Sequence, residues 1–222
     1  MKKALALLLA LTLLTSSLIQ PIGVSAYVDF EYDAVDIQVA LEEERELTED
    51  EFYAFIGLME EYISFEEGKI IIEGEFETLS HMLGEESIEY MVEGIEYLNE
   101  LADEEELVIT ENGTIYETSN DEFTLQSGGR NRTTWHWWGT RNYMNTSRAN
   151  SAATRFRNAS TVATATGAIS AFFGFAPGRA VSTVLSHYWR GLGDTIAARN
   201  ANHSRGVRVN FTWVFVYTVA RQ

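Results

Sequence analysis

The amino-acid sequence predicts an α+β protein, in which a small acidic helical domain with a terminal hairpin precedes a cationic domain with a helical hairpin flanked by two β-strands. Apolar residues recur at helical spacing within residues 52–63 and 88–101. Residues 133–138 and 207–217 instead alternate as strands do, and the second stretch is rich in β-branched and aromatic residues. Because both periods occur in one chain, we expect helices and strands together.

The first 26 residues have the pattern of an export signal. A lysine pair opens the chain, residues 4–14 are almost all apolar, and small residues lead up to Ala26. The apolar run is too short for a lasting membrane anchor. We therefore expect cleavage after Ala26 and a secreted, extracellular chain that begins at Tyr27.

The remaining chain divides into two segments of opposite charge. Residues 27–128 contain 32 Asp and Glu against two basic residues, whereas residues 129–222 contain 12 Arg, no Lys, no Glu and one Asp. Each segment therefore supplies the counter-charge of the other, which predicts that they interact. We expect residues 27–125 to be an acidic pro-region that masks a cationic, Trp- and Arg-rich effector domain at residues 131–222. Two solvated domains of unrelated charge are the alternative.

Residues 126–130, Gln-Ser-Gly-Gly-Arg, separate the two segments. Proteases readily reach small, flexible residues of this kind. We therefore expect processing beside Gly128, Gly129 and Arg130, in addition to removal of the signal after Ala26.

The acidic segment carries periodic apolar residues, which a disordered acidic tail would lack. A capping box at residues 48–51 predicts the start of a first helix, whose apolar face extends over residues 52–63. Residues 68–72 suit a short extended piece or turn. Further helices are predicted over residues 75–83 and 88–101.

The acidic segment is expected to close with a hairpin over residues 107–116, where Asn112 and Gly113 suit a tight turn. The carboxylates of this segment have no His or Lys partner at catalytic spacing. We therefore expect a solvated acidic face rather than paired catalytic acids.

The basic segment is predicted to begin with a strand over residues 133–138, which Gly139 ends. A helix is expected from near Arg141 to Asn158. Arginines seven residues apart would line one stripe of this helix: Arg141, Arg148 and Arg155.

Residues 158–178 contain no charged side chain and would span roughly 31 Å as a helix, about the thickness of a bilayer core. An amphipathic helix over residues 181–196 follows, so the two are expected to form a hairpin that inserts into a membrane. The last strand, residues 206–219, is expected to place alternate residues on one face and to pair with residues 133–138.

All five tryptophans lie in the basic segment, three of them in Trp135-His-Trp-Trp-Gly139. Aromatic residues fill hydrophobic cores, but Trp also favours the headgroup level of a membrane, where Arg binds anionic lipid, and both interpretations stay open. Alternation suits Trp135 and Trp137 to the core and leaves Trp138 as the better candidate for membrane contact. The expected membrane- or envelope-binding residues are Trp135, Trp137, Trp138, Arg141, Arg148, Arg155, Trp189, Arg190 and Trp213.

Other function classes have less support. Cysteine is absent and the four histidines are scattered, so we expect no disulfide, metal site or cofactor. Ser186, His187 and Asp194 have the residue types of a catalytic triad but lack a nucleophile elbow or oxyanion motif, and we expect no enzyme. Arginine and aromatic residues also suit stacking on single-stranded nucleic acid, a partner that export argues against.

Several features together carry a family resemblance: the order of signal, acidic pro-region and cationic domain, then Trp135-His-Trp-Trp-Gly139 with Tyr143-Met-Asn145, the uncharged Gly/Ala-rich segment and the closing strand from Val209 to Tyr217. In these features the chain resembles precursors of large secreted bacteriocins of Gram-positive bacteria, the geobacillin-like group. The resemblance implies an antimicrobial toxin that is released from its pro-region and acts on an anionic bacterial membrane or envelope.

A separate immunity protein is a further partner to be considered under this interpretation. The alternative is an unprocessed secreted or cell-wall-associated binding protein without catalytic activity, whose acidic and basic segments form one permanent unit.

Overall fold

The computed structural model describes residues 46–74, 76–118, 129–175, 186–202 and 204–222. Residues 32–222, which include the basic segment and the acidic segment from Tyr32 onward, form one compact unit, and helices and antiparallel sheets make the chain an α+β protein. The elements are α3 Glu49–Glu60, β1 Ile63–Glu66, β2 Lys69–Ile72, α4 Glu77–Leu83, α5 Glu85–Asp103, β3 Leu107–Ile109, β4 Ile115–Glu117, β5 Arg132–His136, β6 Gly139–Met144, α6 Thr146–Arg157, α7 Val162–Phe173, α8 Ser186–Asn200, β7 Val207–Thr212 and β8 Tyr217–Arg221.

Helix α3 begins at the predicted capping box. The Thr48 hydroxyl accepts a hydrogen bond from the Glu51 amide at 3.3 Å, and the Glu51 carboxylate accepts one from the Thr48 amide at 2.8 Å. Both bonds satisfy donors that a helix start leaves without partners. The helix ends at Glu60, because Ile63 already pairs with Ile72 in the β1–β2 hairpin. The prediction that Ile63 belongs to the helix is therefore wrong.

The rest of the acidic segment follows the predicted order of two helices and a hairpin. Helices α4 and α5 meet at Gly84, and strands β3 and β4 flank the predicted turn. At this turn Gly113 has the positive φ of 76° that favours glycine, and its amide donates to the Thr110 carbonyl at 2.9 Å. The buried apolar residues of the segment include Leu47, Phe52, Phe55, Ile56, Met59, Ile70, Met91, Ile95, Leu98 and Leu107.

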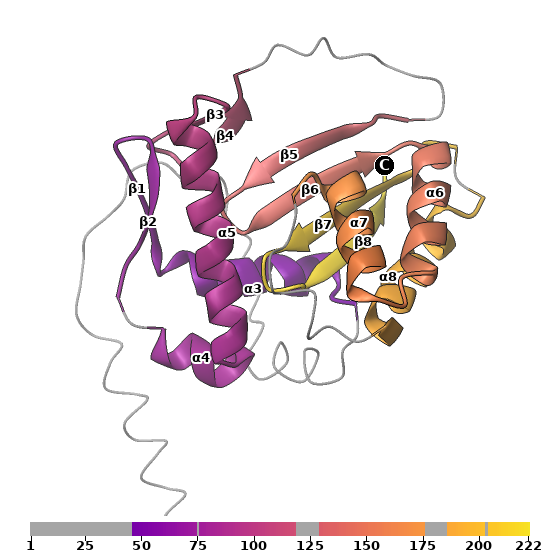
Figure 1. Cartoon of the computed structure of the whole chain (residues 1–222), viewed down its shortest axis with the longest axis horizontal. Coiled ribbons are helices and arrows are strands. Elements are labelled where there is room, and N and C mark those ends of the chain that lie inside the picture. The colour runs from indigo at the N-terminus through magenta and orange to yellow at the C-terminus, as the bar shows by residue number, and fades with distance from the viewer. Residues whose placement is uncertain (1–45, 75, 119–128, 176–185, 203) are drawn as a thin grey trace, which may run out of the picture. The chain divides into compact units, whose positions relative to one another are not determined.

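The basic segment contains a four-stranded antiparallel sheet in the order β5-β6-β7-β8 (Figure 1). Residues 141–144 belong to strand β6, so the predicted helix start near Arg141 is wrong. The predicted pairing of residues 133–138 with the final strand is also wrong, because β6 lies between β5 and β7.

The predicted single strand over residues 206–219 is instead a hairpin of β7 and β8. The Thr212 hydroxyl and carbonyl accept hydrogen bonds from the Val216 and Phe215 amides at 2.9 and 3.1 Å. Phe215 has a positive φ of 63°, which is uncommon for a residue other than glycine. The rings of Trp189 and Phe211 pack edge-on against Phe215 and hold it in place. Alternate residues across the turn therefore do not share one sheet face.

Helices α6, α7 and α8 pack with one another and against one face of the sheet. Phe173 stacks on Phe211 of β7 at 4.4 Å, and Phe156 stacks on Phe173 at 5.5 Å between ring centroids. Helix α7 is formed by part of the uncharged stretch of residues 158–178. Residues 176–185, which belong to the predicted helical hairpin, lie outside the described residues. Within the described part of the chain, none of the helices combines the length and the apolar character needed to cross a membrane.

Candidate functional site

All five tryptophans of the sequence-predicted site are buried, with exposed fractions between 1 % and 8 %. In the intact chain they therefore belong to the core, and Trp138, the better candidate for membrane contact, is buried with the others. The reason is local geometry, because strand β5 ends at His136 and Trp137-Trp138 form the turn to β6. Strand alternation stops at that turn.

Hydrogen bonds join the turn between β5 and β6 to Trp213, the residue that follows β7. The Trp213 amide donates to the Trp138 carbonyl at 3.0 Å, and the Trp213 indole N–H donates to the Trp137 carbonyl at 2.6 Å. Gly139 has a φ of 144°, and a Cβ atom there would lie 2.2 Å from the Phe211 carbonyl oxygen. Only glycine therefore fits this position, which explains the Trp-Trp-Gly sequence at the turn.

Helix α5 of the acidic segment packs against the aromatic residues of the basic segment. Tyr90 meets Phe215 edge-on at 5.6 Å, and Tyr97 lies 6.1 Å from Trp135 between ring centroids. Between these two contacts, the ring of Trp213 lies so close to Gly94 of α5 that only glycine fits at that position. We call these residues the aromatic interface: Tyr90, Gly94, Tyr97, Trp135, Trp213 and Phe215.

Two further elements of the acidic segment extend this cover. Phe52 of α3 packs edge-on against Trp138 at 5.3 Å. Glu117 of β4 accepts a hydrogen bond from the Trp135 indole N–H at 3.1 Å. The Trp residues of the basic segment are thus buried partly by the acidic segment. The roles of Tyr90, Gly94 and Tyr97 were not predicted from the sequence, although their i, i+4 and i+7 spacing places them on one helix face.

Replacing Gly94 by alanine is expected to destabilise the chain by about 1–3 kcal/mol, because the added methyl overpacks the interface. A Cβ atom on Gly94 would lie 2.3 Å from Cδ2 of the buried Trp213 ring. This cost outweighs the gain of up to about 1 kcal/mol that alanine brings to a helix. Urea denaturation followed by circular dichroism measures the change.

Gly167→Ala on α7 is the matched control, because a Cβ atom there meets nothing within 4 Å. This variant is expected to be as stable as the wild type or slightly more stable. An unchanged free energy of unfolding in Gly94→Ala would contradict the close packing of α5 on Trp213.

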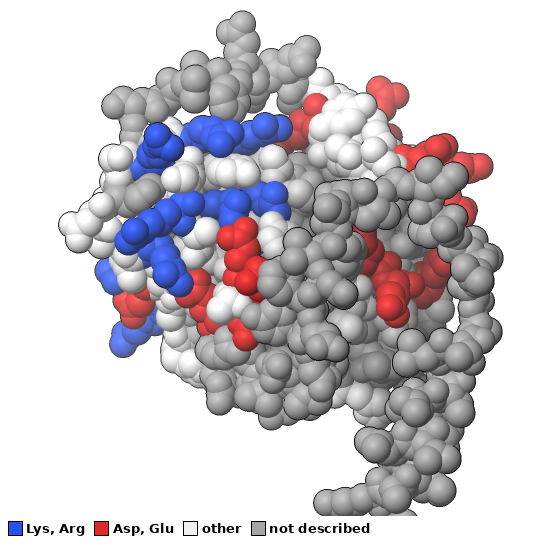
Figure 2. Space-filling view, turned by 180° about the vertical axis from the view of Figure 1, so that it is seen from behind, with Lys and Arg blue, Asp and Glu red and all other residues white. Residues whose placement is uncertain are grey.

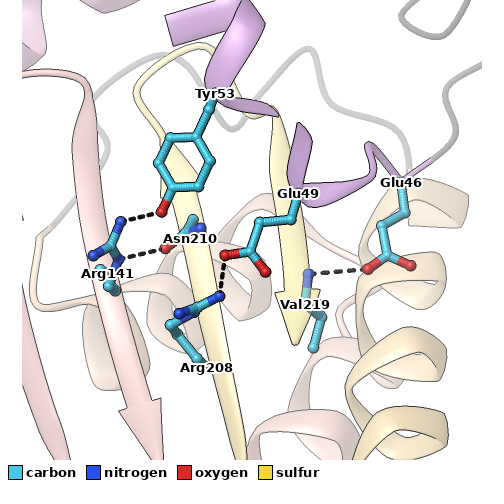
Figure 3. Close-up of polar contacts among 7 residues, drawn as sticks. All are labelled: Glu46, Glu49, Tyr53, Arg141, Arg208, Asn210 and Val219. Carbon is cyan, nitrogen blue, oxygen red and sulfur yellow. Dashed lines mark hydrogen bonds and ion pairs between the residues drawn. The ribbon is translucent and has the colours of Figure 1, made fainter. Parts of the chain in front are cut away.

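Polar contacts join α3 to the sheet (Figure 3). Glu49 forms an ion pair with Arg208 of β7. Arg141 of β6 donates from Nη2 to the Tyr53 hydroxyl at 2.5 Å and from Nε to the side-chain Oδ1 of Asn210 at 2.8 Å. Acidic and basic residues from opposite parts of the sequence therefore meet on the sheet face.

Glu46 makes a second polar contact with the sheet. Its carboxylate accepts a hydrogen bond from the Val219 amide at 2.9 Å and lies 3.6 Å from the Arg199 guanidinium. Burial raises the pKa of Glu46, and these two partners partly offset the effect. The carboxylate satisfies a backbone donor of β8 that the sheet does not pair.

The predicted arginine stripe does not form, since Arg141 lies on the sheet. Arg148 and Arg155 extend from α6 over the Phe172 ring, at 5.7 and 5.8 Å from its centroid. Arg190 is exposed on α8. Figure 2 shows Lys and Arg side chains gathered in bands on one face, with Asp and Glu side chains alongside.

The seam between the segments is described from Gly129 onward, and Ala26 and Gly128 lie outside the described residues. A Cβ atom on Gly129 would lie 1.7 Å from the Arg205 carbonyl oxygen. The Arg130 amide donates to the Gln222 side chain at 3.0 Å, and that side chain donates back to the Arg130 carbonyl at 3.1 Å. Gly129 and Arg130 are thus tied to the basic segment.

The residues considered for a triad have other surroundings. Asp194 pairs with Arg157 at 2.6 Å, His187 is exposed, and the Ser186 side chain lies outside the described residues. Within the described ranges, no three His, Asp or Glu side chains gather as metal ligands would.

Comparisons with protein-family models, with curated proteins and with solved structures find no match. The features of this chain that bear on function are the charge division, the seam and the aromatic interface.

Proposed function

We propose that the chain is the precursor of a secreted, non-enzymatic, bacteriocin-like protein. The acidic segment would mask the basic segment, which binds and perturbs anionic bacterial membranes once it is released. The aromatic interface and the contact of Phe52 with Trp138 carry this proposal, because the acidic segment covers Trp135, Trp138 and Trp213 from α3, α5 and β4.

Release of the acidic segment would uncover these tryptophans beside arginine side chains. Trp at the headgroup level and Arg on anionic lipid are the usual pairing of a membrane-binding surface. A contiguous aromatic patch of this kind is costly in water, so it requires either a mask or a target. This physical requirement supports a masked form that precedes an active one.

Charge supports the same arrangement. The acidic segment has 32 acidic side chains, and two of them, Glu46 and Glu49, pair with Arg199 and Arg208 of the basic segment. The long-range attraction between the segments keeps the mask close to its partner. An anionic membrane offers the same arginines a competing counter-charge.

Dye leakage from phosphatidylglycerol vesicles tests the proposal with three samples: the uncut chain from Tyr27, the same chain cut between Gly128 and Gly129, and residues 129–222 alone. We expect the uncut chain to release little dye from the vesicles and residues 129–222 to release much of it. The cut chain is expected to release the dye more slowly than residues 129–222 alone, because the aromatic interface holds the segments together until the membrane displaces the mask.

Phosphatidylcholine vesicles are the control for anionic charge. Absence of leakage from residues 129–222 would refute membrane perturbation. Equal leakage from the uncut chain would refute masking.

One observation favours the alternative of a permanent, unprocessed secreted or cell-wall-associated binding protein. The close fit of Gly94 on Trp213 resembles the packing of a domain core more than that of a transient contact. The mass of the protein in the culture supernatant separates the two proposals. A single species from Tyr27 to Gln222 favours the binding protein, and a species starting near Gly129 favours the precursor.

A further inference from the structure

Two arginines and an asparagine lie together on the sheet face that turns away from Phe211 and helix α7. Arg141 of β6 is paired in register with Asn210 of β7, and the next pair on the same sheet face is Tyr143 with Arg208. Alternate residues of a strand point to opposite faces, so these three side chains share one face, opposite Phe211. Arg141 and Arg208 are diagonal neighbours across the two strands, close enough to bind one small anion together.

Two hydrogen-bond donors in this cluster are buried and have no partner among the described residues. They are the Asn210 side-chain amide, on a residue that is 1 % exposed, and the Nε–H of Arg208. The other half of the Asn210 amide accepts from Arg141, which fixes the direction of its free N–H donor. Buried donors without partners are costly and uncommon in folded proteins, so a pair of them side by side indicates a missing acceptor.

A carboxylate already occupies part of this cluster. Glu49 pairs with Arg208, and the Tyr53 hydroxyl accepts from Arg141, so these two acceptors come from the first turns of α3 (Figure 3). Among the described residues, Glu49 is the carboxylate that pairs with one of these two guanidinium groups, and its side chain is 44 % exposed. Within the described part of the chain the cluster is thus only partly neutralised, and it is open to solvent at Glu49.

We propose that Arg141, Arg208 and Asn210 form a binding site for a phosphate group, for which Glu49 is a competing carboxylate supplied by the acidic segment. A phosphate group offers more acceptor oxygens than a carboxylate. It therefore satisfies the guanidinium forks and the free amide donor together. The site is present in the intact chain and does not depend on membrane perturbation. Its occupation by a lipid phosphate, rather than by free phosphate, rests on the proposed function.

The test uses the full chain from Tyr27, as wild type and as Glu49→Gln, titrated with inorganic phosphate in a calorimeter. Glu49→Gln is expected to bind phosphate about tenfold more tightly, because one charged competitor is removed. Asp50→Asn makes the same change in net charge on the same exposed turn, and Asp50 forms no ion pair with the sheet among the described residues. It is expected to leave phosphate binding unchanged.

A second substitution tests the buried donor. Arg208→Lys in the Glu49→Gln background keeps the positive charge but removes the Nε–H and the fork. We expect loss of most of the gained affinity, with circular dichroism confirming that the variant folds. The proposal is overturned if Glu49→Gln binds phosphate no better than wild type, or if Asp50→Asn gains as much.

Vesicles distinguish the two sources of phosphate. Stronger binding of Glu49→Gln to phosphatidylglycerol vesicles, reversed by Arg208→Lys, would assign the site to lipid headgroups. A gain for inorganic phosphate without a gain on vesicles would assign it to free phosphate. Because the calorimetric arm contains no membrane, failure of the leakage experiment would leave the phosphate site standing.

Discussion

Replacing Trp189 by alanine is expected to lower the free energy of unfolding by about 3–5 kcal/mol, the usual cost of deleting a large buried aromatic side chain. Trp189 of α8 is fully buried. Its ring stacks with Phe156 and Phe211, and it meets Phe215 edge-on at 5.8 Å. The substitution therefore removes contacts to α6, to β7 and to the turn after β7 at once.

Far-ultraviolet circular dichroism during urea denaturation measures this loss without depending on tryptophan fluorescence. Tyr116→Ala is the aromatic control, because Tyr116 is exposed on β4 and its loss is expected to change stability by at most about 0.5 kcal/mol. If Trp189→Ala lowered the free energy of unfolding as little as this control, the result would contradict the packing of α6 and α8 on the sheet.

Lowering the pH from 6.5 to 4 is expected to destabilise the chain through His136. Burial lowers the pKa of His136 to about 4, and the nearby charge of Arg141 adds to the effect. The unfolded chain takes up this proton near pH 6.5, whereas the folded chain resists it. The free energy of unfolding therefore rises with pH across this window, and the contribution lost on acidification is about 3 kcal/mol.

His136→Phe isolates this contribution, because the variant cannot titrate and keeps a ring stacked on Trp138, as His136 is at 4.5 Å. The difference between wild type and variant is expected to change by about 3 kcal/mol between pH 6.5 and 4. The raised pKa of Glu46 acts in the opposite sense at acid pH and is present in both proteins. A pH-independent difference would contradict the burial of a neutral His136. His81→Gln, at an exposed position, is the control.

Acidification also bears on the proposed release. His136 stacks on Trp138, which packs against Phe52 of the acidic segment. A charge on His136 would add positive charge beside Arg141 and disfavour the buried stack. Dye release by the cut chain should therefore be faster at pH 4 than at pH 7.

The parts of the fold that the sequence predicts correctly are those with a local cause. The capping box of Thr48 and Glu51 and the hairpin at Gly113 each depend on side chains within a few residues of one another. Strand β6 escaped prediction because two of its core-facing side chains, Thr140 and Asn142, are polar and joined by a hydrogen bond of 2.8 Å, while Met144 on the same face is apolar. A strand whose buried face is mostly polar shows no apolar alternation.

The candidate site likewise has features that the sequence predicts and features that only the structure shows. Composition alone established the division into an acidic and a basic segment, because charge needs no structure to be counted. The positions of the tryptophans depended on turns at Trp137-Trp138 and after Thr212, which no Pro or Asn marks and which distant aromatic contacts stabilise. Only the tertiary structure decided that the tryptophans lie against the acidic segment and that Arg141, Arg208 and Asn210 converge. Packing and strand register depend on residues far apart in the chain, so a local sequence pattern does not predict them.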